Sequence, residues 1–295
     1  MGRVAGSRRG LLRYAAPAIA SVALLLGATA CGERSEPTGS SAPLYPVTIQ
    51  VGDRPLVVRQ AARRVVALDD PTTEIVRALG AGNLIVGPPP GNKIDLAAVR
   101  RARPDLIVAE EATGGPDLAR AASATHAEVY TAPGDSIRQV ERAITQLGLL
   151  LDRPVQARAL VRRIEARRRA VQTALAHVPG TTVFVDTGLF TTVSDQSLIG
   201  DLIREAHGRN IAGSTGNGAP IEPDELLRLD PDVYLATSDS MISLEDLRRS
   251  AKTGKLRAVR NGRFGIVSSD LLEPGPRVGE GLVAVARLLH PNAFR

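Results

Sequence analysis

The sequence predicts an α/β fold made of two lobes with mostly parallel sheets, joined by a single long helix. Buried strand patterns alternate with helical patterns in both halves of the 295 residues, which is typical of parallel sheets covered on both faces. A nearly continuous helical tract, residues 135–177, separates the halves. The motifs RPDLIVA and DPDVYLA occupy equivalent places in the two halves and indicate two lobes of one design, although such a segment is also a common helix-to-strand step.

The chain divides into five predicted segments. They are an export signal at 1–30, a lipidated cysteine with a flexible tether at 31–46, an N-terminal α/β lobe at 47–134, a helical segment with the interlobe helix at 135–178, and a C-terminal α/β lobe at 179–295.

The first segment has the pattern of an export signal, because four arginines precede an uncharged apolar run at 14–30. The stretch SRRGLLR resembles a twin-arginine signal, and a generic basic region explains it nearly as well. The four arginines account for four of the six net positive charges, so the remainder of the chain carries only +2. Since the remainder also lacks a basic run interleaved with aromatic residues, no nucleic-acid partner is expected.

Cys31 is the only cysteine, so no internal disulfide is possible. The sequence LLLGATAC, followed by polar residues, resembles the lipobox of bacterial lipoproteins, in which this cysteine is lipidated and becomes the new N-terminus. Ala28 departs from that pattern, and Ala28, Thr29 and Ala30 also fit ordinary signal cleavage, which leaves a soluble secreted form as the alternative. We expect an exported lipoprotein, at the cell surface or in the periplasm, anchored to the membrane through Cys31.

The N-terminal lobe is predicted to open with a hairpin and to continue with alternating strands and helices. Asp70 is the predicted N-cap of the first helix, and Pro71 suits its first turn. A proline-glycine loop at 87–92 follows the second strand of the sheet. The predicted strands are 47–51, 56–58, 64–68, 83–86, 105–109 and 128–131, and the predicted helices begin at 70 and run over 96–102 and 116–122.

Two helices are predicted in the central segment. Apolar residues at steps of three and four form one stripe from Ile137 to Leu151, and Pro154 suits the start of a new helix but not the interior of an old one. The second helix, 154–177, would reach about 36 Å, which is long enough to connect two lobes. The alternative is a surface helix inside one domain.

The C-terminal lobe repeats the strand and helix pattern. The predicted strands are 181–185, 232–236 and 263–267, and the predicted helices are 197–206, 224–229, 244–249 and 277–289.

Six segments carry a resemblance to a known family. They are YPVTIQVGDRPLVV, RRVVALDDPTTEIVRALGAGNLIVG, RARPDLIVA, LIGDLIREAHGRNIAG, LRLDPDVYLA and GPRVGEGLVAVARLLHP. In this order they resemble the opening strand pair, the first βαβ unit, the first helix-to-strand step, the second-lobe helix, the second helix-to-strand step and the closing helix of the iron-chelate and vitamin B12 class of bacterial ABC-transporter substrate-binding proteins. The resemblance covers residues 45–291 and implies two lobes joined by one rigid helix, a ligand cleft between them, and little domain closure.

Open α/β sheets bind ligands at the carboxyl ends of their strands, which defines the candidate loops. These loops are 69–72, 87–92, 110–111, 186–192, 213–219, 237–240 and 269–274. Within them the resemblance places ligand contacts near Pro89, Glu110, Phe190, Asn217 and Glu273, and the strand-end rule adds Asp70 and Glu111. The structural alternatives are that Asp70 only caps its helix, that the proline run only stiffens a turn, and that Phe190 belongs to the second core.

Composition narrows the ligand class. Aromatic residues are 3% of the chain and Trp is absent, which disfavours flat macrocycles such as haem or cobalamin. No histidine lies in a candidate loop and no His/Asp/Glu cluster is evident, so we expect no bare metal ion and no cofactor. A ferric siderophore, whose metal is bound through its organic shell, is the first choice. The arginine cluster usual for an anionic chelate is not evident, and Arg277 is the nearest arginine.

An enzyme is not expected, because the sequence lacks a G-x-S-x-G elbow, a catalytic cysteine and a histidine in the predicted cleft.

The resemblance implies a monomer that docks on a membrane permease through one carboxylate on each lobe. Asp224, with Glu222 and Glu225 beside it, falls at the second-lobe position, and Ala97 occupies the matching first-lobe position, where Asp95 is a nearby substitute. The three C-terminal acids also suit a solvated first turn of a helix. Because Ala97 lacks the carboxylate that the resemblance implies, the alternative function is a ligand-sensing or scaffolding surface lipoprotein not coupled to a transporter.

Overall fold

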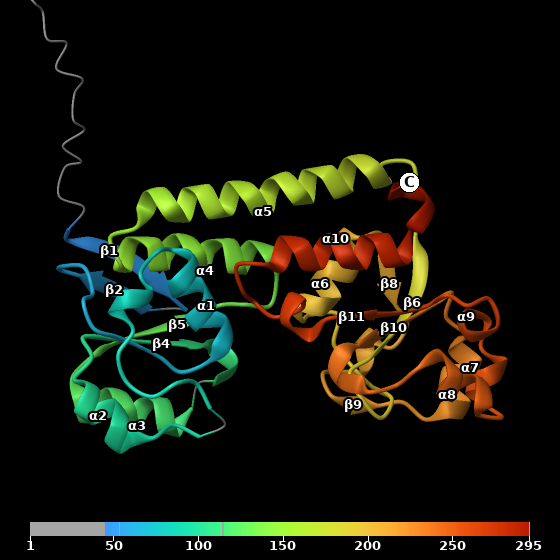
Figure 1. Cartoon of the computed structure of the whole chain (residues 1–295), viewed down its shortest axis with the longest axis horizontal. Helices are drawn as coiled ribbons and strands as arrows, with labels where there is room; N and C mark the ends of the chain where they lie inside the picture. The colour runs from blue at the N-terminus through green and yellow to red at the C-terminus, as the bar shows by residue number, and fades with distance from the viewer. Residues whose placement is uncertain (1–44, 53, 92, 114, 295) are drawn as a thin grey trace, which may run out of the picture. The chain divides into compact units, whose positions relative to one another are not determined.

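The computed structural model describes residues 45–52, 54–91, 93–113 and 115–294 (Figure 1). Pro43–Arg295 forms one compact unit. The predicted export signal, Cys31 and all but the end of the predicted tether lie outside the described residues. Over the described ranges, no helix is both long enough and apolar enough to span a membrane.

The N-terminal lobe contains a parallel sheet in the order β3-β4-β5, with a β1–β2 hairpin beside it. In β3, Val65 and Ala67 join one apolar cluster, whereas Val66 joins a cluster on the opposite face. Both faces of the sheet are buried, which explains the unbroken apolar runs in the sequence. The elements of this lobe are β1 (Val47–Val51), β2 (Arg54–Val58), β3 (Val65–Ala67), α1 (Asp70–Ala78), α2 (Leu96–Ala102), β4 (Leu106–Glu110), α3 (Pro116–Thr125) and β5 (Glu128–Ala132).

The C-terminal lobe contains a second parallel sheet, in the order β11-β10-β6-β8, and a short antiparallel pair, β7–β9. Phe184 and Tyr234 pack edge to face at 5.3 Å between ring centroids on one face of this sheet. The elements of this lobe are β6 (Thr181–Asp186), β7 (Thr191–Thr192), α6 (Leu198–Glu205), β8 (Gly208–Asn210), β9 (Ala219–Pro220), α7 (Pro223–Leu229), β10 (Val233–Thr237), α8 (Leu244–Arg249), α9 (Arg257–Arg260), β11 (Phe264–Val267) and α10 (Val278–Leu289).

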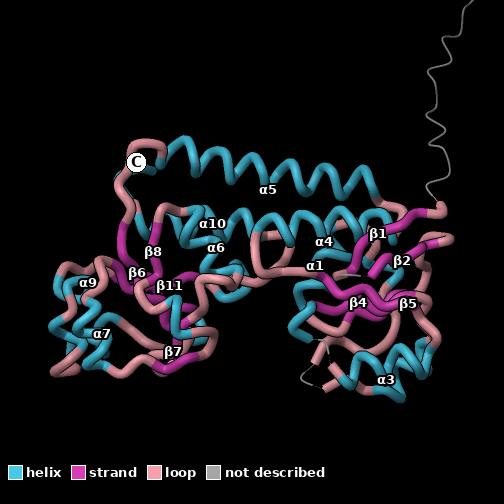
Figure 2. Tube along the Cα trace, turned by 180° about the vertical axis from the view of Figure 1, so that it is seen from behind, coloured by secondary structure: helices cyan, strands magenta, loops and turns pink. Residues whose placement is uncertain are grey.

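Two central helices connect the sheets: α4 (Ile137–Leu150) and α5 (Pro154–Leu175). Helix α5 packs on both α4 and α10, so it contacts elements of both lobes (Figures 1 and 2). Two glycines permit the close approach. A Cβ on Gly148 of α4 would overlap the Cβ of Ala157, and a Cβ on Gly279 of α10 would lie 3.3 Å from the Cα of Ile164. Helix α5 is therefore the connecting helix that the sequence predicts, and not a surface helix of one domain.

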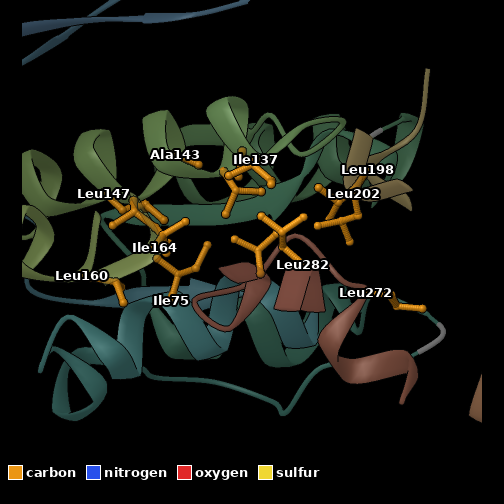
Figure 3. Packing of buried hydrophobic residues seen from close by; sticks show 14 of the residues in the cluster. Ile75, Ile137, Ala143, Leu147, Leu160, Ile164, Leu198, Leu202, Leu272 and Leu282 are labelled. Atoms are coloured by element: carbon orange, nitrogen blue, oxygen red, sulfur yellow. The ribbon is translucent and has the colours of Figure 1, made fainter. Parts of the chain in front are cut away.

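One apolar cluster runs continuously beneath these helices and through both lobes. It includes Ile75 of α1, Leu147 of α4, Ile164 of α5, Leu202 of α6 and Leu282 of α10, all of which are buried (Figure 3). Because a close-packed core resists shear, this cluster favours a fixed arrangement of the lobes. The strands therefore present their carboxyl ends in a defined geometry.

The predicted elements match most of the observed ones, and the exceptions are short. The hairpin, α2 and α8 lie where the sequence predicts them. The predicted strand at 83–86 is wrong: a 3₁₀ turn, Gly82–Leu84, takes its place, and only a single bridge joins Ile85 to Val65. The short strands β7, β8 and β9 were not predicted, because two or three residues carry no periodic signal.

Candidate functional site

A pocket of about 440 Å³ lies where strand ends of the N-terminal lobe meet a loop of the C-terminal lobe. Strand β3 leads into Asp69 and Asp70, strand β4 ends at Glu110, and the segment between β11 and α10 brings Glu273. The residues that line the pocket are Leu68, Asp69, Asp70, Pro71, Pro90, Gly91, Glu110, Thr113, Glu273 and Pro274. The two lobes thus form one cavity from the carboxyl ends of their sheets, as expected for open α/β sheets.

Asp69 has a structural function at the floor of this pocket. Its carboxylate accepts hydrogen bonds from the backbone N–H of Thr72 at 3.0 Å and from the N–H of Glu110 at 2.6 Å. The prediction that Asp70 caps α1 is therefore wrong, since Asp69 is the N-cap. The cap lies one residue earlier because only the extended backbone of Asp69 lets its carboxylate turn back onto the first turn. This arrangement leaves the exposed carboxylate of Asp70 available at the pocket.

Glu110 is the most perturbed carboxyl group of the pocket. Its Oε1 atom is buried, and no hydrogen-bond partner reaches it within the described residues. Burial raises the pKa of Glu110 to about 7, and the negative charges of Asp69 and Glu273 contribute to this increase. Across the pocket, burial also raises the pKa of Glu273, with repulsion from Asp70 and Glu74 as further causes.

Among the described residues that line the pocket, no positive charge balances these acids. None of its described lining residues is Lys, Arg or His. Lys93 lines a neighbouring cavity of about 210 Å³, together with Pro89 and Asp95. Arg277 is occupied elsewhere, because its guanidinium donates to Asp270 at 2.7 Å and to Glu280 at 3.0 Å. The pocket therefore favours a ligand that is positively charged or rich in hydrogen-bond donors.

The acids of the pocket are not arranged as a direct metal site. Over the described residues, no group of three or more His, Cys, Asp or Glu side chains is placed to hold a metal ion. Carboxylate oxygens suit hard cations, but a bound cation requires them to converge on one point.

The comparisons with known proteins agree with this geometry. The periplasmic binding protein family profile matches residues 65–271. This chain belongs to the periplasmic binding protein family. Its resemblance to the class of substrate-binding proteins that serves ABC transporters, predicted from the sequence, is thereby confirmed.

A curated relative of this periplasmic binding protein is the uncharacterized ABC transporter substrate-binding lipoprotein YvrC of Bacillus subtilis, which is 23% identical over 92% of this chain and 97% of its own length. Helicobacter pylori CeuE, solved as a Ni-His complex, has a TM-score of 0.73 at 16% identity over 84% of this chain and 89% of its own. A protein of an ABC-type Fe³⁺-hydroxamate transport system of Saccharomonospora viridis has a TM-score of 0.67 at 19% identity over 83% and 99%. These likenesses confirm the two-lobed fold.

The structure brings together only part of the predicted ligand set of this periplasmic binding protein. Asp70, Glu110 and Glu273 line the pocket. Pro89 lines the neighbouring cavity. Glu111 is exposed in the 3₁₀ turn that follows β4 and is absent from the lining of both cavities.

Two predicted ligand residues lie in loops of the C-terminal lobe, outside these cavities. Phe190 is half-buried against the second apolar core, as expected for a core residue. The side-chain carbonyl of Asn217 accepts a hydrogen bond from the N–H of Ser194 at 2.6 Å and holds the β7–β9 region together.

Seven of the ten lining residues lie inside or beside predicted loops but are not predicted as ligand contacts, among them Asp69, Thr113 and Pro274. Asp69 and Pro274 lie in the loops 69–72 and 269–274, and Thr113 lies two residues past the loop 110–111. The strand-end rule is the signal that finds them, because it selects loops rather than single residues. Which side chain of a loop faces the pocket depends on local hydrogen bonds such as those of Asp69.

The predicted docking acids of this periplasmic binding protein lie on the surface of both lobes. Asp224, in the first turn of α7, forms an ion pair with Lys252 at 2.6 Å. Asp95 caps α2 by accepting a hydrogen bond from the N–H of Ala98 at 2.9 Å. Ala97 is exposed on α2, whereas Glu222 immediately precedes α7 and makes no capping hydrogen bond.

Proposed function

We propose that this chain is the substrate-binding protein of an ABC importer and that it captures a neutral or cationic metal chelate, with a ferric hydroxamate siderophore as the first choice. The observation that carries the proposal is the acidic pocket between the lobes, in which Asp70, Glu110 and Glu273 meet without a cation in the described lining. A negative pocket attracts cationic ligands and rejects anionic ones.

Charge discriminates among ferric chelates. Three hydroxamate groups neutralise Fe³⁺, and a trihydroxamate with a free amine is cationic overall. Three dianionic catecholates leave the ferric complex strongly anionic, and placing such a complex beside Glu110 and Glu273 would be repulsive. The Saccharomonospora viridis neighbour, whose transport system takes Fe³⁺-hydroxamate, supports the first choice. Cobalamin and haem are less favoured, since no aromatic side chain is among the described lining residues.

A calorimetric and native mass-spectrometric panel tests the ligand class. The mature chain is presented with a cationic ferric trihydroxamate, an anionic ferric tris-catecholate, haem and cobalamin. We expect the trihydroxamate to be retained and the tris-catecholate to be rejected at neutral pH. Preferential binding of the tris-catecholate by folded protein would contradict the assignment of the pocket.

We also propose the division of the chain into an export signal at 1–30, a lipidated Cys31 with a tether to residue 46, lobes at 47–134 and 179–295, and a helical segment at 135–178 between them. YvrC is named a lipoprotein, which supports membrane anchoring at the extracytoplasmic face. Globomycin, which blocks lipoprotein signal cleavage, tests the anchor. Treated cells would accumulate a longer form of the wild-type chain, and Cys31→Ser would abolish this response.

Docking on the permease is proposed through Asp224, with Glu222 and Glu225 beside it, and through Asp95 on the other lobe. Asp224→Ala should lower ligand uptake severalfold while leaving ligand affinity in solution unchanged, because the side chain lies outside the pocket. Uptake is measured with radiolabelled iron chelate in cells that express the permease. The matched control is Glu245→Ala, an exposed acid on α8.

Ala97 supports a second candidate function, a surface lipoprotein that senses a ligand without delivering it. Helix α2 presents this exposed alanine at the sequence position that matches Asp224 on α7. In a host with the permease, Ala97→Glu should raise uptake if the lobes dock as a pair. Unchanged uptake from both Ala97→Glu and Asp224→Ala, with intact ligand binding, would favour the sensor.

A further inference from the structure

Helix α5 carries an exposed arginine face that neither the fold nor the ligand pocket uses. Arg158, Arg162 and Arg163 are exposed, and within the described residues no carboxylate lies within 4.0 Å of their guanidinium groups. The next three arginines differ, because each is paired with an acid. The pairs are Arg167 with Glu280, Arg168 with Glu205 and Arg169 with Glu165.

The geometry of this face is regular. Arg158 and Arg162 are one helical turn apart, and Arg169 follows two turns later, so the three lie along one side of α5 over about 16 Å. Ala166 and Ala170 are exposed beside them, and Glu165, the ion-pair partner of Arg169, lies between Arg162 and Arg169 on the same side. The result is a surface of net positive charge, and among the described residues none of the exposed large apolar side chains lies between Arg158 and Arg169.

The place of α5 in the unit adds a second observation. Helix α5 packs on α4 and α10, and these two helices lie between α5 and the sheets whose strand ends supply the pocket (Figures 1 and 2). The acidic pocket and the arginine face are therefore on opposite sides of the α4 and α10 layer. A negatively charged surface would attract one side of the unit and repel the other.

The chain also enters the unit beside the start of α5. The hydroxyl of Tyr45 donates to the backbone carbonyl of Leu149 at 2.5 Å, and α5 begins at Pro154. Cys31 precedes Tyr45 by 14 residues, so a chain fixed at Cys31 can reach at most about 50 Å. An anchor at Cys31 would hold the arginine face within reach of the surface to which it is attached.

We propose that the arginine face of α5, formed by Arg158, Arg162, Arg163 and Arg169, lies on an anionic phospholipid membrane. Guanidinium groups bind phosphate oxygens in a bidentate manner, and each basic side chain at an anionic membrane surface strengthens attachment roughly fivefold. In this pose the pocket faces away from the membrane, toward the solvent that supplies the ligand. This pose is the resting position of the protein at the membrane, and it does not depend on the identity of the ligand.

Vesicle flotation tests the proposal on the mature chain, residues 31–295, with Cys31→Ser to remove the lipid. Vesicles of phosphatidylglycerol and phosphatidylcholine in equal parts are compared with pure phosphatidylcholine. We expect flotation only with the anionic vesicles, and its loss in high salt. The triple variant R158Q/R162Q/R163Q should lower the bound fraction at least tenfold.

The matched control is R100Q/R101Q/R248Q, which removes the same charge from exposed arginines on α2 and α8. It should float like the parent chain. Equal loss in both triple variants would show a general charge effect and overturn the proposal, as would the absence of binding to anionic vesicles by the folded parent.

A label gives an independent readout, because the Cys31→Ser chain contains no other cysteine. A polarity-sensitive fluorophore at Thr173→Cys on α5 should shift to the blue on anionic vesicles, whereas one at Ala97→Cys on α2 should not. A shift at position 97 without one at 173 would place a different face on the membrane and would overturn the proposal.

Discussion

The pocket and the outer face of α5 each gather charges of one sign, but the pocket partly buries its carboxylates whereas α5 exposes its arginines to solvent. The pocket gathers carboxylates from two lobes, and the burial of two of them raises the pKa values of Glu110 and Glu273. The face of α5 spreads like charges along a solvated helix, where water and salt screen them. The net charge of +2 predicted for the mature chain reveals neither region, because the effect of a charge depends on where it lies in the structure.

The largest effect is expected where α5 is attached to α4. Gly148→Val would place side-chain atoms where the Cβ of Ala157 lies, and the helices would separate. We expect a loss of about 3 kcal/mol or more in the free energy of unfolding, measured by urea denaturation. Ala166→Val, at an exposed site on α5, is the control and should cost less than about 1 kcal/mol. Similar losses in both variants would mean that close packing at Gly148 does not hold the layer together.

The next effect concerns the pocket alone. Asp70→Asn combined with Glu273→Gln removes one carboxylate from each lobe and should weaken binding of a cationic ferric trihydroxamate by roughly 10- to 100-fold. Calorimetry on the soluble mature chain measures the affinity. Asp224→Asn, an acid outside the pocket, should leave it unchanged. Tighter binding of the cation by the double variant would reverse our interpretation of the pocket charge.

A smaller effect is the pH dependence of stability, which is expected from the pocket and not from α5. Glu110 has a folded-state pKa of about 7, above its ordinary value of 4.5, so the folded protein keeps a proton that the unfolded chain has lost. The folded state therefore loses stability as the pH rises from about 4.5 to 7. Glu110→Gln should remove this loss and stabilise the protein by roughly 1 kcal/mol at pH 8, after allowance for solvent near the pocket.

Thermal unfolding of wild type and Glu110→Gln across pH 4.5 to 8 measures this effect. The advantage of the variant should shrink as the pH falls toward 4.5, where the carboxyl group is protonated in the folded state and half protonated in the unfolded chain. A constant difference at all pH values would show that the raised pKa is not its cause.

The smallest effect is expected on the face of α5. Arg162→Gln should change the free energy of unfolding by less than about 0.5 kcal/mol, since its guanidinium is exposed and unpaired among the described residues. Arg168→Gln is the contrast. Its guanidinium donates to Glu205 at 2.9 Å with both side chains mostly buried, and we expect a loss of about 1 to 2 kcal/mol. Equal losses would mean that the outer arginines stabilise the fold.

Much of the fold was predictable because it depends on local patterns. The apolar stripe from Ile137 to Leu151 and the proline at 154 predict α4 and the start of α5, and the apolar runs predict β3, β4 and β10. The apolar run at 83–86 predicts a strand where the structure has a 3₁₀ turn at 82–84, since a short apolar run is ambiguous without its pairing partner. Asp70 was mistaken for a cap because Asp69 and Asp70 are equivalent in sequence and differ only in backbone conformation.

The sequence by itself determined the alternation of strands and helices, the length of α5 and the loops that follow the strands, because each depends on residues close together in the chain. Only the tertiary structure decided which acids share a pocket. Glu110 and Glu273 are 163 positions apart, and burial raises the pKa of each, with repulsion from Asp69 and Glu273 adding to the increase at Glu110 once the lobes pack together. The tertiary structure likewise decided which arginines of α5 pair with acids on neighbouring helices and which face solvent. Because α5 is packed on one side only, this depends on the direction in which each side chain leaves the helix.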